Sequence, residues 1–141
     1  MPLQIKPPIL ADFHLERSDK TYGISDEPTT VTIRQATQSA TERRAKLFSN
    51  IIREMSGEAD SIRLIQQFSF EELKRIEVML TLAGCNISDE NGKSIFVFNK
   101  DGFITDEVAF NKAWGRLPTL VANEIHEKVL EVNVDWAPQG E

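Results

Sequence analysis

The sequence predicts a mainly α protein of the α+β class, with about four to five helices, a small β-hairpin or meander, and an extended, partly β N-terminal arm. Prolines and period-two patterns dominate residues 1–38, whereas apolar residues at helical spacing dominate most of residues 39–133. A polar turn containing Asn91-Gly92 separates two short β-rich stretches inside the helical part. We therefore expect an arm over 1–38, a helical domain with a small hairpin over 39–133, and a C-terminal tail over 134–141.

The arm contains two stretches in which apolar residues alternate with polar neighbours, as they do in a half-buried strand. These apolar residues are Ala11, Phe13 and Leu15 in the first stretch and Val31 and Ile33 in the second. The pattern predicts two strands that can pair with each other. The polar residues 18–23 and 26–28 between them are interpreted as loop.

Two long helices are expected in the first half of the helical domain. The first covers about 40–56, because Ser39-x-x-Glu42 has the spacing of a capping box and Gly57 can take the left-handed position that ends a helix. Its apolar stripe consists of Leu47, Phe48, Ile51, Ile52 and Met55. A short helical segment near 59–66 follows, and the second capping box, Ser69-x-x-Glu72, predicts a new helix that stops at Gly84.

The second half of the domain is expected to open with β structure. Residues 85–87 and 94–98 flank the Asn91-Gly92 turn, and residues 99–102 offer another turn before Phe103. Thr105-Asp106-Glu107 combines a helix N-cap with acids in the first turn, so a helix should start there and end near Gly115. Pro118 suits the first turn of a last helix that reaches about residue 132.

Composition and charge exclude several classes of function. The net charge of −6 opposes a phosphate-binding face, and the nearest basic group, Arg43, Arg44 and Lys46, is beside Glu42, so we expect no nucleic-acid partner. No apolar run approaches the roughly 18–20 residues that a membrane span needs, and we expect neither an export signal nor an anchor. Cys85 is the single cysteine, which excludes an internal disulfide, fits a reducing compartment and is expected to be a small buried hydrophobe.

Residues that commonly perform catalysis are scarce and badly spaced. The two histidines, His14 and His126, form no metal-ligand spacing, and His126 is expected on the surface of the last helix. The acidic turns 89–92 and 99–102 fail the calcium-loop pattern, because an apolar residue occupies the first ligand position. We therefore expect no enzyme activity, no metal and no cofactor.

Aromatic residues gather in the C-terminal half instead. Phe96, Phe98, Phe103, Phe110 and Trp114 fall within about twenty residues, followed by Leu117-Pro118. Most of them are expected in the core, since a chain of this length cannot expose them all. The remainder are expected to form a patch that binds a protein partner.

Several segments resemble tail assembly chaperones of long-tailed (siphovirus-type) bacteriophages. They are TVTIRQAT over 30–37, ERRAKLF over 42–48, F-x-x-x-W-x-x-L-P-x-x-V over 110–121 and VLEVN over 129–133. The resemblance implies a non-catalytic, self-associating protein of the host cytoplasm that binds the tape measure protein and helps tail tube subunits assemble. The candidate partner-binding residues are Val31, Ile33, Arg34, Trp114, Leu117 and Pro118 at matching positions, with Phe103 from the aromatic group.

Two other classes of function stay open at the level of sequence. One is a structural tail completion or head–tail connector protein that is retained in the virion. The other is a small enzyme or a regulatory nucleic-acid binder, which the lack of a convergent polar site and of a basic face disfavours.

Overall fold

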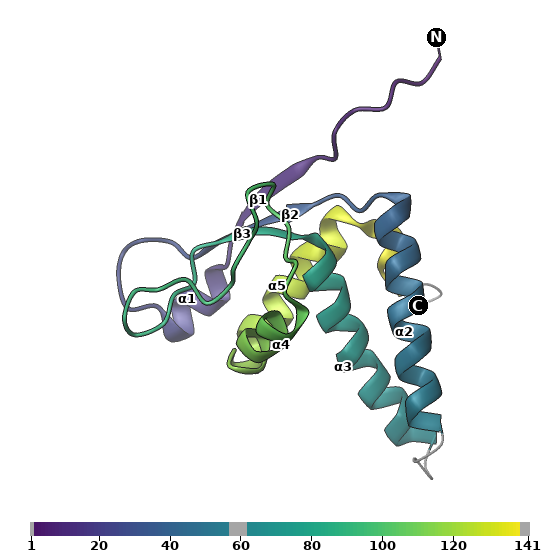
Figure 1. Cartoon of the computed structure of the whole chain (residues 1–141). Coiled ribbons are helices and arrows are strands. Elements are labelled where there is room, and N and C mark those ends of the chain that lie inside the picture. The colour runs from purple at the N-terminus through teal and green to yellow at the C-terminus, as the bar shows by residue number, and fades with distance from the viewer. Residues whose placement is uncertain (1, 57–61, 139–141) are drawn as a thin grey trace.

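The computed structural model describes residues 2–56 and 62–138 and has the expected α+β class. Within this part of the chain, five α-helices surround a small three-stranded antiparallel sheet, and a thin arm extends away from the body (Figure 1). In chain order the elements are β1 (Leu10–His14), α1 (Glu16–Tyr22), β2 (Thr30–Arg34), α2 (Gln38–Ser56), α3 (Ile62–Thr81), β3 (Leu82–Cys85), α4 (Glu107–Gly115), α5 (Thr119–Val132) and a 3₁₀ turn (Val134–Trp136).

The sheet has the order β1-β2-β3, so the two strands expected in the arm do pair with each other. Phe13 lies opposite Val31 and Ala11 opposite Ile33, which puts their side chains on one face. β2 then pairs with β3, where the register shifts between Thr32 and Ile33. The residues of the expected arm are therefore part of the same sheet as β3, which follows α3 directly.

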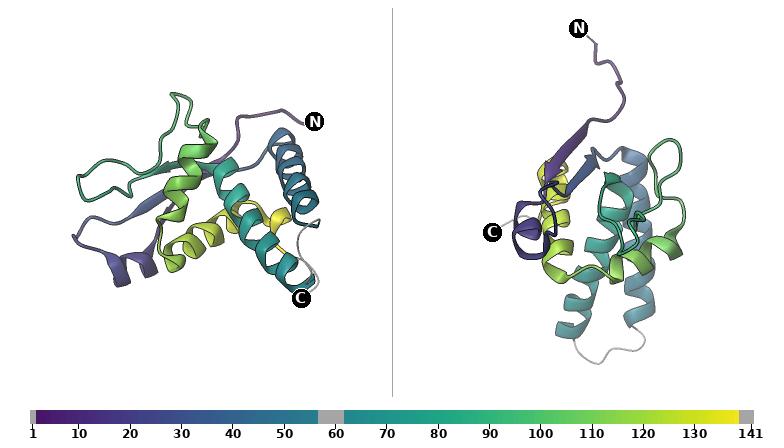
Figure 2. Two further views of the ribbon diagram at one scale, coloured as in Figure 1. Left: turned by 60° about the horizontal axis from the view of Figure 1, so that its bottom comes forward. Right: turned by 90° about the vertical axis from the view of Figure 1, so that its left-hand side faces the viewer.

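The core lies where the inner face of the sheet meets α3, α4 and α5. Its buried members include Leu15, Val31, Ile33, Val78, Leu82, Phe96, Phe110, Ile125 and Val129. Burial of each such side chain stabilises the fold by about 1.5–3 kcal/mol. α2 and α3 pack against each other as a long antiparallel pair that extends away from the sheet (Figure 2).

Three expected loops and segments differ in the structure. Residues 16–22 form α1, although residues 18–23 were expected as loop. The two helices expected near 59–66 and from Ser69 are a single helix, α3, and Ser69 lies inside it; residues 59–61 and Gly57 lie outside the described residues. The spacing of a capping box thus occurs inside a helix, where the Glu72 carboxylate pairs with Arg75 of the same helix.

The expected hairpin is reduced to its turns. Gly92 and Gly102 have φ values of 79° and 82°, in the left-handed region that glycine favours, and each lies in a tight turn. Ser88 and Ser94 form an isolated bridge, and residues 94–98 form no strand. Phe96 is buried there and stacks on Phe110 of α4 with ring centroids 5.5 Å apart, so this segment packs on a helix and not in the sheet.

The helices expected near Asp106 and Pro118 are present. The Asp106 side chain caps α4 by accepting a hydrogen bond from the Ala109 amide at 3.0 Å, and Pro118 directly precedes α5. Part of the expected tail is ordered, since residues 134–136 form a 3₁₀ turn and Trp136 is buried. The Arg44 guanidinium lies 5.0 Å from the centre of the Trp136 ring, which attaches this turn to α2.

Candidate functional site

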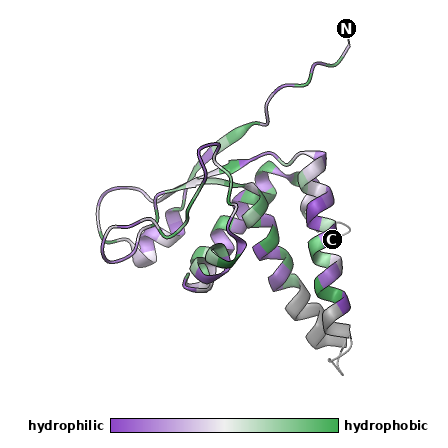
Figure 3. Cartoon of the chain, in the orientation of Figure 1, coloured by the Kyte–Doolittle hydropathy of each residue, from purple (hydrophilic) through white to green (hydrophobic). Residues whose placement is uncertain are grey.

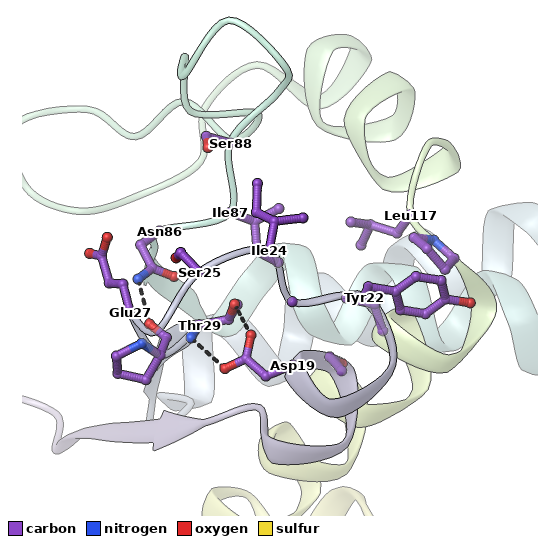
Figure 4. A pocket seen from close by; sticks show the side chains of 15 residues that line it. Asp19, Tyr22, Ile24, Ser25, Glu27, Thr29, Asn86, Ile87, Ser88 and Leu117 are labelled. Atoms are coloured by element: carbon purple, nitrogen blue, oxygen red, sulfur yellow. Dashed lines mark hydrogen bonds between the residues drawn. The ribbon is translucent and has the colours of Figure 1, made fainter.

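A pocket with a volume of about 320 Å³ lies beside α1. We call it the loop pocket. Three segments form it: the loop that follows α1, the stretch after β3, and the turn between α4 and α5 (Figure 4). It is lined by Ser18, Asp19, Tyr22, Gly23, Ile24, Ser25, Glu27, Pro28, Thr29, Asn86, Ile87, Ser88, Leu117, Pro118 and Val121.

Side-chain hydrogen bonds hold the end of the α1–β2 loop that leads into β2. The Asp19 carboxylate accepts from the Thr29 amide at 2.8 Å and from the Thr29 hydroxyl at 2.5 Å, and His14 Nε2 lies 2.7 Å from its Oδ2. The hydrogen bond from the Thr29 hydroxyl is the main cause that lowers the pKa of Asp19 below its ordinary value. This carboxylate joins α1 to the residue that precedes β2, and the loop between them forms one wall of the pocket.

Asn86 fixes the same loop from the other side. Its amide group donates to the Pro28 carbonyl at 2.9 Å, and its carbonyl oxygen accepts from the Thr30 amide at 2.8 Å. The stretch after β3 is thereby tied to the start of β2. Two segments that are far apart in the sequence are held in a fixed relation across the pocket.

Apolar side chains stand exposed on this fixed loop. Ile24 is fully exposed and Tyr22 is half exposed, whereas Leu117 is half-buried and Pro118 is exposed across the pocket. Figure 4 shows Ile24 beside Ile87 and Tyr22 near Leu117. Exposed apolar groups that cluster at a cavity mark a contact surface for another molecule.

The charged side chains among the lining residues are Asp19 and Glu27, and both are acidic. Asp19 is engaged by Thr29 and His14, whereas Glu27 is exposed at the rim. The charged side chains of the loop pocket therefore carry negative charge alone.

The structure separates the seven candidate residues into three places. Val31 and Ile33 are buried in the core. Arg34 is also buried: its guanidinium lies 3.9 Å from the centre of the Phe103 ring and donates to the Gly102 carbonyl at 2.8 Å. Loss of hydration lowers the pKa of Arg34 from its ordinary value. The three residues therefore serve packing and loop attachment.

Only part of the C-terminal group reaches the loop pocket. Trp114 stacks on Phe110 with ring centroids 6.0 Å apart, whereas Leu117 and Pro118 line the pocket. Sequence reasoning missed Tyr22 and Ile24. Two large apolar residues around Gly23 in an otherwise polar stretch were the available signal.

A second polar group lies buried where α2, α3 and α5 meet. Glu77 accepts from Arg44 Nε at 2.8 Å and from Arg44 Nη2 at 2.7 Å, and His126 Nε2 lies 2.6 Å from its other oxygen. His126 was expected on the surface and is instead buried, since Glu77 supplies its polar partner and Phe70 meets it edge-on with ring centroids 6.5 Å apart. Arg44, Glu77 and His126 thus bind one another, and because they lie on α2, α3 and α5, the cluster joins these three helices.

Residues 2–56 and 62–138 contain no group of three or more histidine, cysteine, aspartate or glutamate side chains that could hold a metal ion. In the same described part of the chain, no helix combines the length and the apolar character needed to cross a membrane.

Comparison of the chain with protein-family models, curated proteins and solved structures finds no match. The resemblance to tail assembly chaperones therefore depends on the matched sequence segments alone and stays a prediction.

Proposed function

We propose that this protein is a non-catalytic binding protein that takes up an apolar segment of a partner protein in the loop pocket. The observation that carries the proposal is the fully exposed Ile24 on a loop whose C-terminal end, at Pro28 and Thr29, is held by Asp19 and Asn86. When a partner covers a fixed, exposed apolar side chain, burial stabilises the complex by up to about 1.5–3 kcal/mol for an isoleucine.

The resemblance supplies the proposed partner. As a phage tail assembly chaperone, the protein would bind apolar segments of the tape measure protein in the host cytoplasm and bring tail tube subunits to them. The acidic composition supports this role, because negative charge keeps an assembly of many chaperone copies dispersed while apolar faces are covered. The acidic rim of the pocket favours segments that carry lysine or arginine.

Co-expression of the full chain with a fragment of a phage tape measure protein tests the proposal. The test variant is Ile24→Glu, and the matched control is Val97→Glu, which also puts a charge on an exposed apolar position but lies outside the loop pocket. We expect the wild type and the control to be recovered with the fragment and Ile24→Glu to lose at least about 90% of it, a tenfold effect typical of a central contact. Equal recovery of all three proteins would contradict the assignment of the pocket.

Mass spectrometry of purified virions separates the chaperone from the connector alternative. A chaperone leaves after assembly, so we expect the chain in infected cells and not in the particle. Its presence in virions at the stoichiometry of a structural subunit would refute the chaperone role.

A further inference from the structure

Residues 2–9, which precede β1 and are called the arm from here on, expose large apolar side chains that no described neighbour covers. Leu3 is 88% exposed, Ile5 91% and Ile9 65%. Figure 3 shows hydrophobic and hydrophilic positions mixed along this arm as it leaves the body of the protein. Lys6 is its only charged residue, in a chain whose net charge is −6.

Prolines make the arm stiff. Pro7 and Pro8 fix their own φ, and each keeps the residue before it out of the helical region. An extended proline-rich segment loses little conformational freedom when it binds, which is why such segments are common ligands of shallow apolar pockets with an aromatic wall. The loop pocket offers one aromatic lining residue, Tyr22, together with the apolar side chains of Leu117 and Pro118.

We propose that the loop pocket of one copy of this protein binds the arm of a second copy, with Lys6 of the arm beside Glu27 of the pocket. Charge complementarity supports the match, because the arm has one positive charge and the charged lining residues are acidic. The apolar side chains that each surface exposes, Ile5 in the arm and Ile24 in the pocket, would cover each other.

The arm and the loop pocket lie at opposite ends of β1, which favours exchange between copies over binding within one chain. The arm continues from Leu10, whereas His14 leads through α1 to the pocket loop, and five extended residues span about 17 Å. The arm points away from α1 (Figure 1), and its last residue is held to the sheet by a 2.8 Å hydrogen bond from the Gln35 amide to the Ile9 carbonyl. A return of the arm to its own pocket would break this bond and reverse the chain next to two prolines.

Opposite ends also define the geometry of the exchange. When two copies lie with their β1 strands antiparallel, each arm comes to the end at which the other copy has its pocket. Both arms are then used in a closed dimer with twofold symmetry. The inference rests on the pocket of the proposed function, so the arm of a second copy and a partner segment would compete for it. Its test needs no phage partner, so a failure of exchange and a failure of partner binding are measured separately.

Sedimentation equilibrium of the full chain from about 1 μM to about 1 mM tests the exchange. The arm variant is Ile5→Asp, the pocket variant is Ile24→Glu, and Val97→Glu is the control; circular dichroism verifies that each is folded. We expect a wild-type dimer, a dissociation constant raised at least about tenfold in both test variants, and a change within about twofold in the control. A wild type that stays monomeric throughout, or a dimer that both variants leave intact, would overturn the proposal.

Mixing the two variants distinguishes exchange from simple pairing of β1 edges. The arm variant retains a good pocket and the pocket variant a good arm, so the mixture should form heterodimers with one intact contact, tighter than either variant alone. A mixture no tighter than its components would count against exchange. The charge pair gives a second readout: Lys6→Glu and Glu27→Lys should each weaken the dimer about twofold to fivefold, and the two together on one chain should restore it. If the double variant did not restore the dimer, Lys6 and Glu27 would not be in contact.

Discussion

The strongest prediction about stability concerns Glu124, a buried carboxylate that caps a helix distant in sequence. α1 begins after Leu15, a residue whose side chain cannot accept a hydrogen bond. Glu124 of α5 supplies the missing acceptor to the Ser18 amide at 2.8 Å, the Ser18 hydroxyl at 2.7 Å and the Arg17 amide at 3.2 Å. The free amides at the start of α1 are therefore satisfied from another helix.

The change Glu124→Gln keeps the shape of this side chain and removes its charge. A hydrogen bond to a charged acceptor contributes about 1.5–3 kcal/mol, against about 0.5–1.5 kcal/mol for a neutral one. The new amide can also accept at only one of its two terminal atoms, so its NH₂ group faces a backbone donor. Loss of roughly 1 kcal/mol at each of three hydrogen bonds gives a destabilisation of about 2–4 kcal/mol.

Urea unfolding measures this loss, with Glu127→Gln as the matched control. Glu127 lies on the same helix and pairs with the exposed side chain of Arg17, so its replacement should cost at most about 1 kcal/mol. With a denaturant slope of about 2 kcal/mol/M, Glu124→Gln should lower the midpoint by about 1–2 M. A shift no greater than that of the control would show that Glu124 does not cap α1.

Three further predictions concern pH, thiol reactivity and glycine. Hydrogen bonds lower the pKa of Asp19, and they also lower that of Glu124 although burial acts in the opposite direction. Both carboxylates therefore stabilise the fold at a pH above their pKa in the unfolded chain, which is about 4. Urea midpoints should fall as acid protonates the two groups, and they should fall less steeply in Glu124→Gln. Cys85, expected to be buried, is only partly buried, and this partial burial raises the pKa of its thiol to about 11. A thiol reagent at pH 8 should therefore label it about a hundredfold more slowly than free cysteine, and equal rates would contradict the raised pKa. Gly102→Ala should destabilise by about 1–2 kcal/mol because φ is 82°, whereas Gly115→Ala, with open space around it, should be neutral or stabilising in thermal melts.

The elements that sequence reasoning recovered are those whose signals are local. α4 begins at Asp106 because the side chain that caps it is three residues from the amide that it binds. The start of α5 after Pro118 and the left-handed turns at Gly92 and Gly102 are likewise fixed by neighbouring residues. Such features can be read from a single sequence since the cause and the effect lie within one turn of the chain.

The elements that it missed depend on partners far away in the sequence. α1 has a polar composition and no N-cap of its own, and the carboxylate that completes it is 106 residues from Ser18. His126 was expected in water because its neighbours are charged, yet Glu77, 49 residues away, satisfies it in the interior. Periodicity cannot report a buried polar residue that a distant partner satisfies.

The same distant contacts determine whether the candidate site exists. Tyr22 is the last residue of α1, so the wall of the loop pocket takes its position from a helix that Glu124 completes. Asp19, in the middle of that helix, then holds the far end of the loop through Thr29. A pocket of this kind is invisible to motif reasoning because no residue in it is chemically unusual. The proposed role of Ile24 in binding depends on this arrangement, because Asp19 and Asn86 hold the C-terminal end of the loop on which Ile24 is fully exposed.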